Sequence, residues 1–317
     1  MEKRRKHLSI LIPVLNEEEN LSQLHLSLHS ILEKIGEDYE IIFVDDGSTD
    51  RSYQVMRDIF NEDKHVRVIR LRGHFGQSAA LDTAITHAKG EIIVTIDADL
   101  QDDPENIPDL LKALDKLDVV CGWRSERKDP FTKRWPSKIY NWLARRLLNI
   151  NTHDLNCGLK GFRKEALRDL EIVGEMHRYI PALAAWRGFK VGEVKIKHNP
   201  RKHGKSKYGF TRLFKGFIDM LTVKFIISYS TRPAHVFGLL GATFSTIGFL
   251  IGLYLVLLKY LTGVGIGERP LLLLSILLLV LGVQMISFAM MAELTSRIFF
   301  QIRESKPYSV EEVLEHQ

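Results

Sequence analysis

Through roughly the first two thirds of the chain, short apolar runs alternate with stretches of helical periodicity. The apolar runs read LSILIPV, YEIIFVDD, VRVIRL, EIIVTIDAD and DVVCGW. Helical patterns lie between them, near residues 17–35, 51–62, 76–88 and 104–116. This alternation predicts an α/β domain with a mostly parallel sheet, in which ligands bind beyond the carboxyl ends of the strands.

The pattern changes near residue 230, where two long uncharged runs follow one another. Residues 236–258 and 271–292 contain no charged side chain. As a helix, a run of this length spans about 33 Å, which matches the ~30 Å hydrocarbon core of a bilayer. Uncharged runs this long are rare in soluble cores, so membrane spans are favoured over a pair of buried core helices. The segment 259–270 between them is short and glycine-rich, which predicts a transmembrane hairpin.

Basic residues are distributed unevenly about this hairpin. Arg232, Arg297, Arg303 and Lys306 flank one end, whereas the linker carries Lys259 and Arg269. The positive-inside rule therefore predicts an integral protein of the cell or inner membrane, with the large domain and both termini in the cytoplasm. The expected parts are a cytoplasmic α/β domain (1–209), an amphipathic region (210–232), two transmembrane helices (233–300) and a cytoplasmic tail (301–317).

The segment 210–232 has a helical pattern of its own. Its apolar residues recur at helical spacing, with basic residues between them: Phe210, Leu213, Phe214, Phe217, Ile218 and Leu221. Such a helix can lie in the membrane interface or pack on the soluble domain, and the pattern leaves both interpretations open.

Composition and charge narrow the classes of partner. Hydrophobic residues make up 45% and charged residues 26%, so the chain can bury a sizeable core. The net charge of +5 suits nucleic acid, anionic lipid or phosphorylated small molecules. The two cysteines, Cys121 and Cys157, are too few for a disulfide framework and are expected to be packed as thiols.

Carboxylates crowd together directly after the apolar run EIIVT. Asp97, Asp99 and Gln101 alternate there, so an extended chain would place them on one face. Hard oxygen ligands of this kind suit Mg²⁺ or Mn²⁺, which bind one or two carboxylates together with substrate phosphates. Asp102 and Asp103 are assigned mainly to structure, because Asp103 before Pro104 has the pattern of a helix N-cap.

A second acidic cluster, FVDDGSTD, ends an earlier strand at Asp45 and Asp46. A carboxylate at this edge can accept hydrogen bonds from a ribose or a nucleobase, and Glu17 after the first strand is expected at the same rim. No G-x-G-x-x-G follows the first strand, and no Walker A loop is present. NAD binding and ATPase activity are therefore disfavoured.

A basic, glycine-containing stretch, NPRKHGKSKYG, follows near residue 200. Glycines allow a loop to close, and Arg and Lys bind phosphate oxygens. A solvated basic turn and a nucleic-acid patch are the competing interpretations. The two apolar runs favour a lipid phosphate as the partner.

The ordered set PVLNE, VDDGSTD and DADLQ resembles the family 2 glycosyltransferases with the GT-A fold. MHRYIPALAAWRGFKVGEV followed by NPRKHGKSKYG resembles the polyprenyl-phosphate glycosyltransferases, relatives of dolichol-phosphate mannose synthase. The C-terminal hairpin is similar to that of the bacterial glucosyltransferase and aminoarabinose-transferring branches. The resemblance covers nearly the whole chain.

The resemblance implies a role for particular residues. A nucleoside pocket would be lined by Pro13, Leu15, Glu17, Val44 and Asp46. Asp97, Ala98 and Asp99 would lie along the diphosphate and sugar, and Asp99 and Gln101 would hold Mg²⁺ or Mn²⁺. Arg124, Arg201 and Lys207 would contact phosphates. Two positions depart from the family pattern: Leu15 stands where several relatives have Tyr, and His74 where Asn is expected, which puts a base-stacking contact and a loop contact in question.

The function that the resemblance implies is inverting transfer of a sugar from a nucleotide diphosphate sugar, with a UDP-sugar favoured, to undecaprenyl or dolichyl phosphate. A GDP-mannose donor is the first alternative. A processive polysaccharide synthase is disfavoured because the chain has HRY at 177–179 and no Q-x-x-R-W motif. A catalytically degenerate, membrane-anchored nucleotide-sugar-binding module is the alternative from another class, and contacts between copies of the chain remain open.

Overall fold

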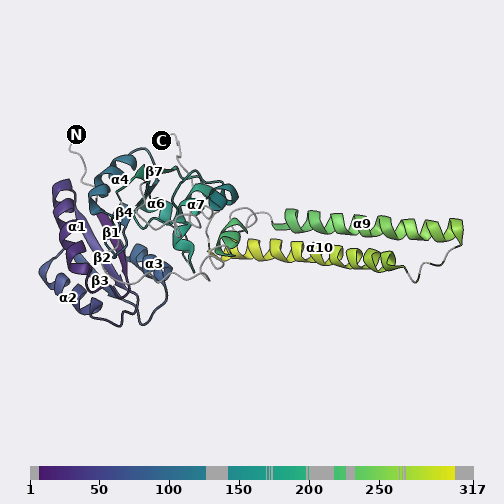
Figure 1. The fold of residues 1–317 in the computed structure, drawn as a ribbon, viewed down its shortest axis with the longest axis horizontal. Helices are drawn as coiled ribbons and strands as arrows, with labels where there is room; N and C mark the ends of the chain where they lie inside the picture. Colours follow the sequence, from purple (N-terminus) through teal and green to yellow (C-terminus); the bar gives the residue numbers. More distant parts are fainter. Residues whose placement is uncertain are drawn as a thin grey trace, which may run out of the picture. The chain divides into compact units, whose positions relative to one another are not determined.

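A computed structural model of the chain contains two compact units, and each is described by itself (Figure 1). The sheet unit is described over residues 7–125, 142–168, 170, 172, 174–197, 199 and 218–223. The helix unit is described over residues 224–225, 233–263, 265, 267 and 269–303.

The sheet unit is built on a seven-stranded sheet in the order β3-β2-β1-β4-β6-β5-β7. The strands are β1 (Leu8–Val14), β2 (Tyr39–Asp45), β3 (Val66–Arg70), β4 (Ile92–Thr95), β5 (Val119–Trp123), β6 (Lys160–Arg163) and β7 (Val191–Lys195). The pairs β1–β2, β1–β4, β2–β3 and β5–β7 are parallel, whereas β6 runs antiparallel to β4 and β5. The predicted mostly parallel α/β sheet is confirmed.

The reversed strand β6 has a consequence for the carboxyl edge of the sheet. Lys160, its first residue, pairs with Thr95 at the end of β4 and with Cys121 in β5. The start of β6 therefore lies at the same edge as the carboxyl ends of the parallel strands.

Helices cover both faces of the sheet, as Figure 1 shows. They are α1 (Leu21–Ile35), α2 (Ser52–Glu62), α3 (Gln77–His87), α4 (Ile107–Ala113), α6 (Lys164–Leu167) and α7 (Ile180–Trp186). Side chains alternate between faces along a strand, so Ile10 and Ile12 of β1 enter the core beneath α1, α2 and α4, while Leu11 enters the core beneath α3, α6 and α7.

The five predicted strands and the four predicted helical stretches are present. The first helix begins at Leu21 rather than near residue 17, because residues 15–20 form a loop. The stretch 104–116 divides into a 3₁₀ turn, Pro104–Asn106, and α4. The hydrophobic pattern did not predict β6 and β7.

The helix unit is a pair of long helices, α9 (Pro233–Thr262) and α10 (Pro270–Arg303), which lie side by side. Small residues let them approach closely: a Cβ on Gly241 would lie 2.7 Å from the carbonyl oxygen of Gly282. Ser275 Oγ donates to the carbonyl of Gly248 at 2.7 Å. Two candidate membrane spans, Ala234–Thr262 and Pro270–Thr295, are long and apolar enough to cross a bilayer, so the structure contains the expected hairpin.

Part of the predicted amphipathic region is described. Residues 218–225 form a helix. Its apolar side chains Ile218, Leu221 and Phe225 are exposed, whereas Met220 and Val223 are buried. The described turns therefore have an exposed apolar stripe as well as a buried one.

Candidate active site

Two loops at the carboxyl ends of β1 and β2 are held together by hydrogen bonds. Asn16, whose φ is 53°, accepts from the backbone N–H of Thr49 through Oδ1 at 2.7 Å. The N–H of Asn16 donates to Ser48 Oγ at 3.0 Å, and that of Glu17 to Ser52 Oγ at 2.8 Å. The PVLNE and VDDGSTD motifs therefore form one structural element.

The predicted nucleoside-pocket residues differ in accessibility. Pro13, Leu15 and Glu17 keep part of their surface exposed beside this pair of loops. Glu17 accepts a hydrogen bond from Asn20 Nδ2 at 2.7 Å. The side chain of Val44 is fully buried in the core beneath α3.

Asp46 holds a third loop in place. Its carboxylate is buried and accepts from His74 Nδ1 at 2.8 Å, the Phe75 N–H at 2.7 Å and the Gly76 N–H at 2.9 Å. His74 stands where Asn is expected in the family, and its imidazole makes the contact between this loop and Asp46. Gly47 packs against the same loop with φ 75°, and a Cβ there would lie 2.6 Å from the carbonyl carbon of Gly73.

The DADLQ segment follows β4 and forms a tight turn. Leu100 adopts φ 60°, which is unusual for a residue with a branched side chain. Asp99 is buried and accepts from the Gln101 N–H at 3.1 Å, while Gln101 is half-buried. Ala98 is buried beside them. A residue with a positive φ, such as Leu100, is often found at a functional site, where the surrounding structure holds it in that conformation.

Asp97 has the most perturbed carboxyl group of this segment. Gln77 Nε2 donates to its Oδ1 at 2.8 Å. Burial, together with the neighbouring charges of Asp99 and Asp102, raises the pKa of Asp97 to about 7, against the lowering effect of Lys160 and Arg124. Concentrated negative charge is therefore a property of this edge in the folded protein, as the sequence predicted.

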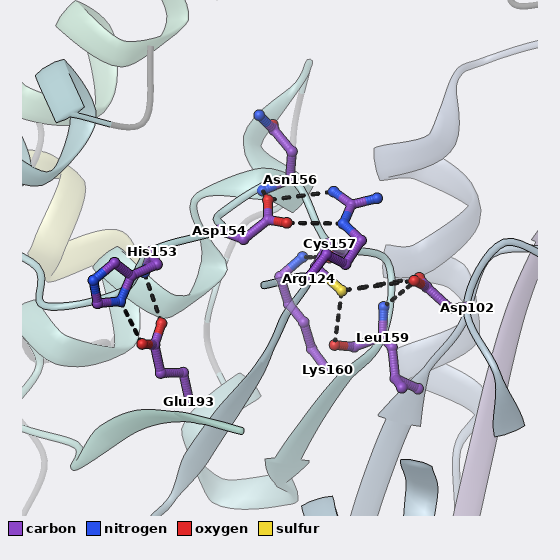
Figure 2. Close-up of polar contacts among 9 residues, drawn as sticks. All are labelled: Asp102, Arg124, His153, Asp154, Asn156, Cys157, Leu159, Lys160 and Glu193. Atoms are coloured by element: carbon purple, nitrogen blue, oxygen red, sulfur yellow. Dashed lines mark hydrogen bonds and ion pairs between the residues drawn. The ribbon is translucent and has the colours of Figure 1, made fainter. Parts of the chain in front are cut away.

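Two cations lie at the same edge, and Figure 2 shows their contacts. Arg124, directly after β5, donates from Nε to Asp154 Oδ2 at 2.8 Å and from Nη2 to Asp154 Oδ1 at 3.3 Å. Lys160 is buried and donates from Nζ to the carbonyl of Cys157. Arg124 was among the predicted site residues, whereas Lys160 and Asp154 were not. The one sign of Lys160 in the sequence was a lysine inside the otherwise apolar stretch LKGF.

Asp102, Asp103 and the cysteines have the structural roles expected of them. Asp102 is buried and accepts from the Leu159 N–H at 3.1 Å (Figure 2). Asp103 accepts from the Glu105 N–H at 3.0 Å and so caps the 3₁₀ turn. Cys121 and Cys157 are buried and free, and burial raises the pKa of both thiols.

The chain that follows β7 reaches the DADLQ turn. The N–H of Asn199 donates to the carbonyl of Gln101 at 2.9 Å, and the N–H of Lys197 to Asn106 Oδ1 at 3.2 Å. Asn199 is two residues before Arg201 in the sequence. Arg201 and Lys207 themselves lie outside the described residues.

The site therefore contains three loops, at the carboxyl ends of β1, β2 and β3, that hydrogen bonds hold together. The DADLQ turn follows β4 beside them, with buried carboxylates and two cations at the neighbouring strand ends. Asp97, Asp99, Gln101 and Arg124 come from this one edge. Oxygen ligands grouped in this way can bind a hard divalent cation, which can in turn bind a diphosphate.

Comparisons with known proteins agree with this architecture. The chain is 37% identical to a dodecaprenyl-phosphate galacturonate synthase of Rhizobium johnstonii, over 98% of this chain and 94% of that protein. It is 34% identical to an undecaprenyl-phosphate 4-deoxy-4-formamido-L-arabinose transferase of Shewanella sediminis, over 96% of this chain and 92% of that protein.

A solved structure has the same fold. It is glucosyl-3-phosphoglycerate synthase of Mycobacterium tuberculosis in complex with Mn²⁺ and UDP-glucose, with a TM-score of 0.54 and 19% identity, covering 69% of this chain and 79% of that one. The sequence model of glycosyl transferase family 2 matches residues 9–171. With this match and the two full-length relatives, the chain belongs to glycosyl transferase family 2.

Proposed function

We propose that this glycosyltransferase moves a sugar from a nucleotide diphosphate sugar to a polyprenyl phosphate. The observation that carries the proposal is the extent of the similarity: two relatives named for polyprenyl-phosphate products match at least 96% of the chain, and so extend over both the sheet unit and the helix unit. A lipid acceptor also explains why α9 and α10 accompany the catalytic sheet.

The three loops that follow β1, β2 and β3, which hydrogen bonds hold together, are the proposed donor site. Pro13, Leu15 and Glu17 would line the nucleoside pocket. Asp46 would hold the loop at His74 in place beside that pocket. A UDP-sugar is the proposed donor, because a protein of the same fold has been solved with UDP-glucose. The two relatives are named for different sugars, so the sugar is left to experiment.

The donor set of the DADLQ turn fits a hard divalent cation, Mg²⁺ or Mn²⁺. Asp99 and Gln101 offer oxygen atoms on a constrained turn, and a cation would offset the negative charge that perturbs Asp97. When bound, such an ion supplies Lewis-acid stabilisation of the leaving nucleoside diphosphate.

In the reaction, a phosphate oxygen of the lipid attacks the anomeric carbon as the bond from that carbon to the diphosphate breaks. The configuration inverts, and the nucleoside diphosphate takes the bonding electrons. A phosphate monoester is mostly ionised at neutral pH, because its second pKa is about 6. Asp97 is therefore assigned to positioning the donor sugar rather than to removing a proton.

Cationic side chains are proposed to stabilise the phosphates. The pair with Asp154 uses two of the donors of the Arg124 guanidinium, which has five. The pair with Asp154 would fix the orientation of Arg124 toward a phosphate. A positive charge that is already oriented in this way stabilises the negative charge that develops in the reaction. Arg201 and Lys207 are proposed to contact phosphates from the segment that follows Asn199.

The helix unit is proposed to hold the enzyme in the membrane. We assign α9 and α10 as the transmembrane hairpin, with the sheet unit and both termini in the cytoplasm. The exposed apolar stripe of residues 218–225 is assigned to the membrane interface, where the lipid phosphate lies.

The test is a transfer assay with matched variants. Detergent-purified protein, Mn²⁺, polyprenyl phosphate and a panel of labelled UDP-sugars and GDP-mannose are incubated, and label extracted into organic solvent is counted. We expect label from one donor, which is lost with EDTA and in Asp99→Asn. Asp103→Asn is the control, because Asn also caps a helix and Asp103 is in the same turn. Full activity in folded Asp99→Asn would overturn the assignment of the metal site.

A further inference from the structure

A second cluster of potential metal ligands lies at the opposite edge of the sheet. His25 and His29 are on α1, and Asp63 directly follows α2, which contacts α1. Tyr39, which begins β2, and His65, just before β3, complete the cluster. These positions are at the amino ends of the strands, whereas Asp99 follows the carboxyl end of β4 (Figure 1). The cluster is therefore separate from the candidate active site.

The potential ligand atoms already converge. Asp63 Oδ2 lies 2.8 Å from His25 Nε2 and 3.5 Å from His29 Nδ1, and the three ligand atoms lie within 4.8 Å of one another. The two histidines are four residues apart, so they project from one face of the helix. Metal–ligand distances for zinc are about 2.0–2.2 Å for nitrogen and oxygen, so small side-chain movements would bring all three atoms onto one ion.

The carboxylate is oriented by groups behind it. His65 donates to Asp63 Oδ1 from its backbone N–H at 2.8 Å and is also paired with it through Nδ1 at 2.9 Å. Oδ1 is thereby held, and Oδ2 faces the other two histidines. Metal-binding carboxylates are characteristically supported by such outer hydrogen bonds.

The surroundings also suit an ion. The Asp63 carboxylate is buried, and three histidine side chains, His25, His29 and His65, pair with it. The Tyr39 hydroxyl donates to Glu33 and lies 3.0 Å from His29 Nδ1. The side chain of His29 is 44% exposed, which gives an ion access from solvent.

We propose that His25 Nε2, His29 Nδ1 and Asp63 Oδ2 bind a divalent transition metal ion, Zn²⁺ being the best match. Two imidazoles and a carboxylate suit zinc rather than magnesium, which favours oxygen ligands. The ion replaces the proton shared between His25 and Asp63, and the His29 proton moves to Nε2 or leaves. A water molecule completes a tetrahedral site. The ion would tie α1 to the segment between α2 and β3.

The test uses full-length, detergent-purified protein stripped with a chelator and then dialysed. Zinc content after exposure to Zn²⁺ is measured with excess Mg²⁺ present, and Co²⁺ is added separately to read the visible spectrum of a tetrahedral site. We expect about one equivalent of zinc per chain and a tetrahedral cobalt spectrum. Circular dichroism of each variant confirms that it is folded.

Variants distinguish ligands from supporting groups. His25→Ala and His29→Ala should lose the ion, whereas His65→Ala should bind it about 10–100-fold more weakly, as expected for an outer partner. His87→Ala removes an exposed histidine outside the cluster, and Asp99→Asn removes the proposed catalytic ligand. Both should retain the zinc.

The proposal is overturned if the stripped wild-type protein takes up no zinc under these conditions. It is also overturned if folded His25→Ala and His29→Ala bind as tightly as the wild type, because the ion would then lie elsewhere. Loss of zinc in Asp99→Asn alone would assign the ion to the candidate active site instead.

Discussion

Gly158 lies against the carboxylate of Asp97 so closely that a Cβ at this glycine would stand 2.2 Å from Asp97 Oδ2. Thr95 Oγ1 donates to the carbonyl of the same glycine at 2.8 Å, which fixes the segment before β6 beside the end of β4. The position of the Asp97 carboxylate therefore depends on the absence of a side chain 61 residues away in the sequence, since 158 − 97 = 61.

Gly158→Ala should therefore displace Asp97 and lower transfer activity. A misplacement of about 1 Å can reduce turnover about 100-fold. The measurement is initial rate together with thermal unfolding. Gly265→Ala is the control, because among the described residues no atom lies within 4 Å of a Cβ there, and no positive φ is required. Wild-type turnover in Gly158→Ala would show that the position of Asp97 does not matter.

Asp154→Asn should destabilise the protein by removing the charge that pairs with Arg124. The side chains of both residues are largely buried, with exposed fractions of 13% for Arg124 and 2% for Asp154. Removing one partner of a buried pair costs about 3–5 kcal/mol. Unfolding in denaturant would measure the change.

The matched control for that pair is an exposed one. Arg51 is 85% exposed and pairs with Glu18. Exposed pairs contribute about 0–1 kcal/mol, so Glu18→Gln should have a small effect. Equal losses in Asp154→Asn and Glu18→Gln would contradict the importance assigned to the buried pair.

His177 should make the folded state less stable in mild acid. Burial holds the pKa of His177 well below its usual range, and Arg178 and Lys160 lower it further. The unfolded chain binds a proton at this histidine below about pH 6.5, whereas the folded chain does not. Stability from this residue is therefore present above that pH and decreases as the pH falls.

Thermal unfolding between about pH 7.5 and pH 5 tests this expectation. His177→Asn should flatten the pH dependence, since Asn has no titrating group and can still bond Ser78, the partner of His177 Nδ1 at 2.9 Å. Identical slopes in the variant and the wild type would rule out His177 as their source.

Gly241→Ala should weaken the contact between α9 and α10. A Cβ on Gly241 would lie 2.7 Å from the carbonyl oxygen of Gly282 and 2.9 Å from the backbone nitrogen of Ile286. Overpacking of this kind costs about 1–3 kcal/mol. Gly238→Ala is the control, because its Cβ would meet its nearest atom, the Cβ of Ala289, at 4.0 Å. Thermal unfolding in detergent should separate the two variants, and equal stability would count against close packing at Gly241.

Much of the fold could be predicted because it depends on local patterns. Strands such as LSILIPV are continuous apolar runs, and the intervening helices have clear periodicity, so their order implied a parallel sheet. β6 was missed because KGFR has four residues and two of them are basic. Its antiparallel pairing with β4 and β5 depends on contacts that no local pattern records.

The candidate site shows the same division. Asp97 and Asp99 could be placed at a strand end because they directly follow EIIVT. The partner of Arg124 is 30 residues away, and the constraint from Gly158 is farther still, so neither is visible in a short window. Asp46 was expected to line the nucleoside pocket. Its hydrogen bonds to the loop from His74 to Gly76, at least 28 residues away in the sequence, could not be predicted from a local pattern.

The most direct test of the account is the mass of the lipid product. Purified protein, Mn²⁺, a polyprenyl phosphate and the donor selected from the panel would be incubated, and the lipid extract analysed by mass spectrometry. We expect a new species equal to the polyprenyl phosphate plus one glycosyl residue, with an equal amount of nucleoside diphosphate released. Release of nucleoside diphosphate with the lipid unchanged, and the sugar recovered in water, would contradict it.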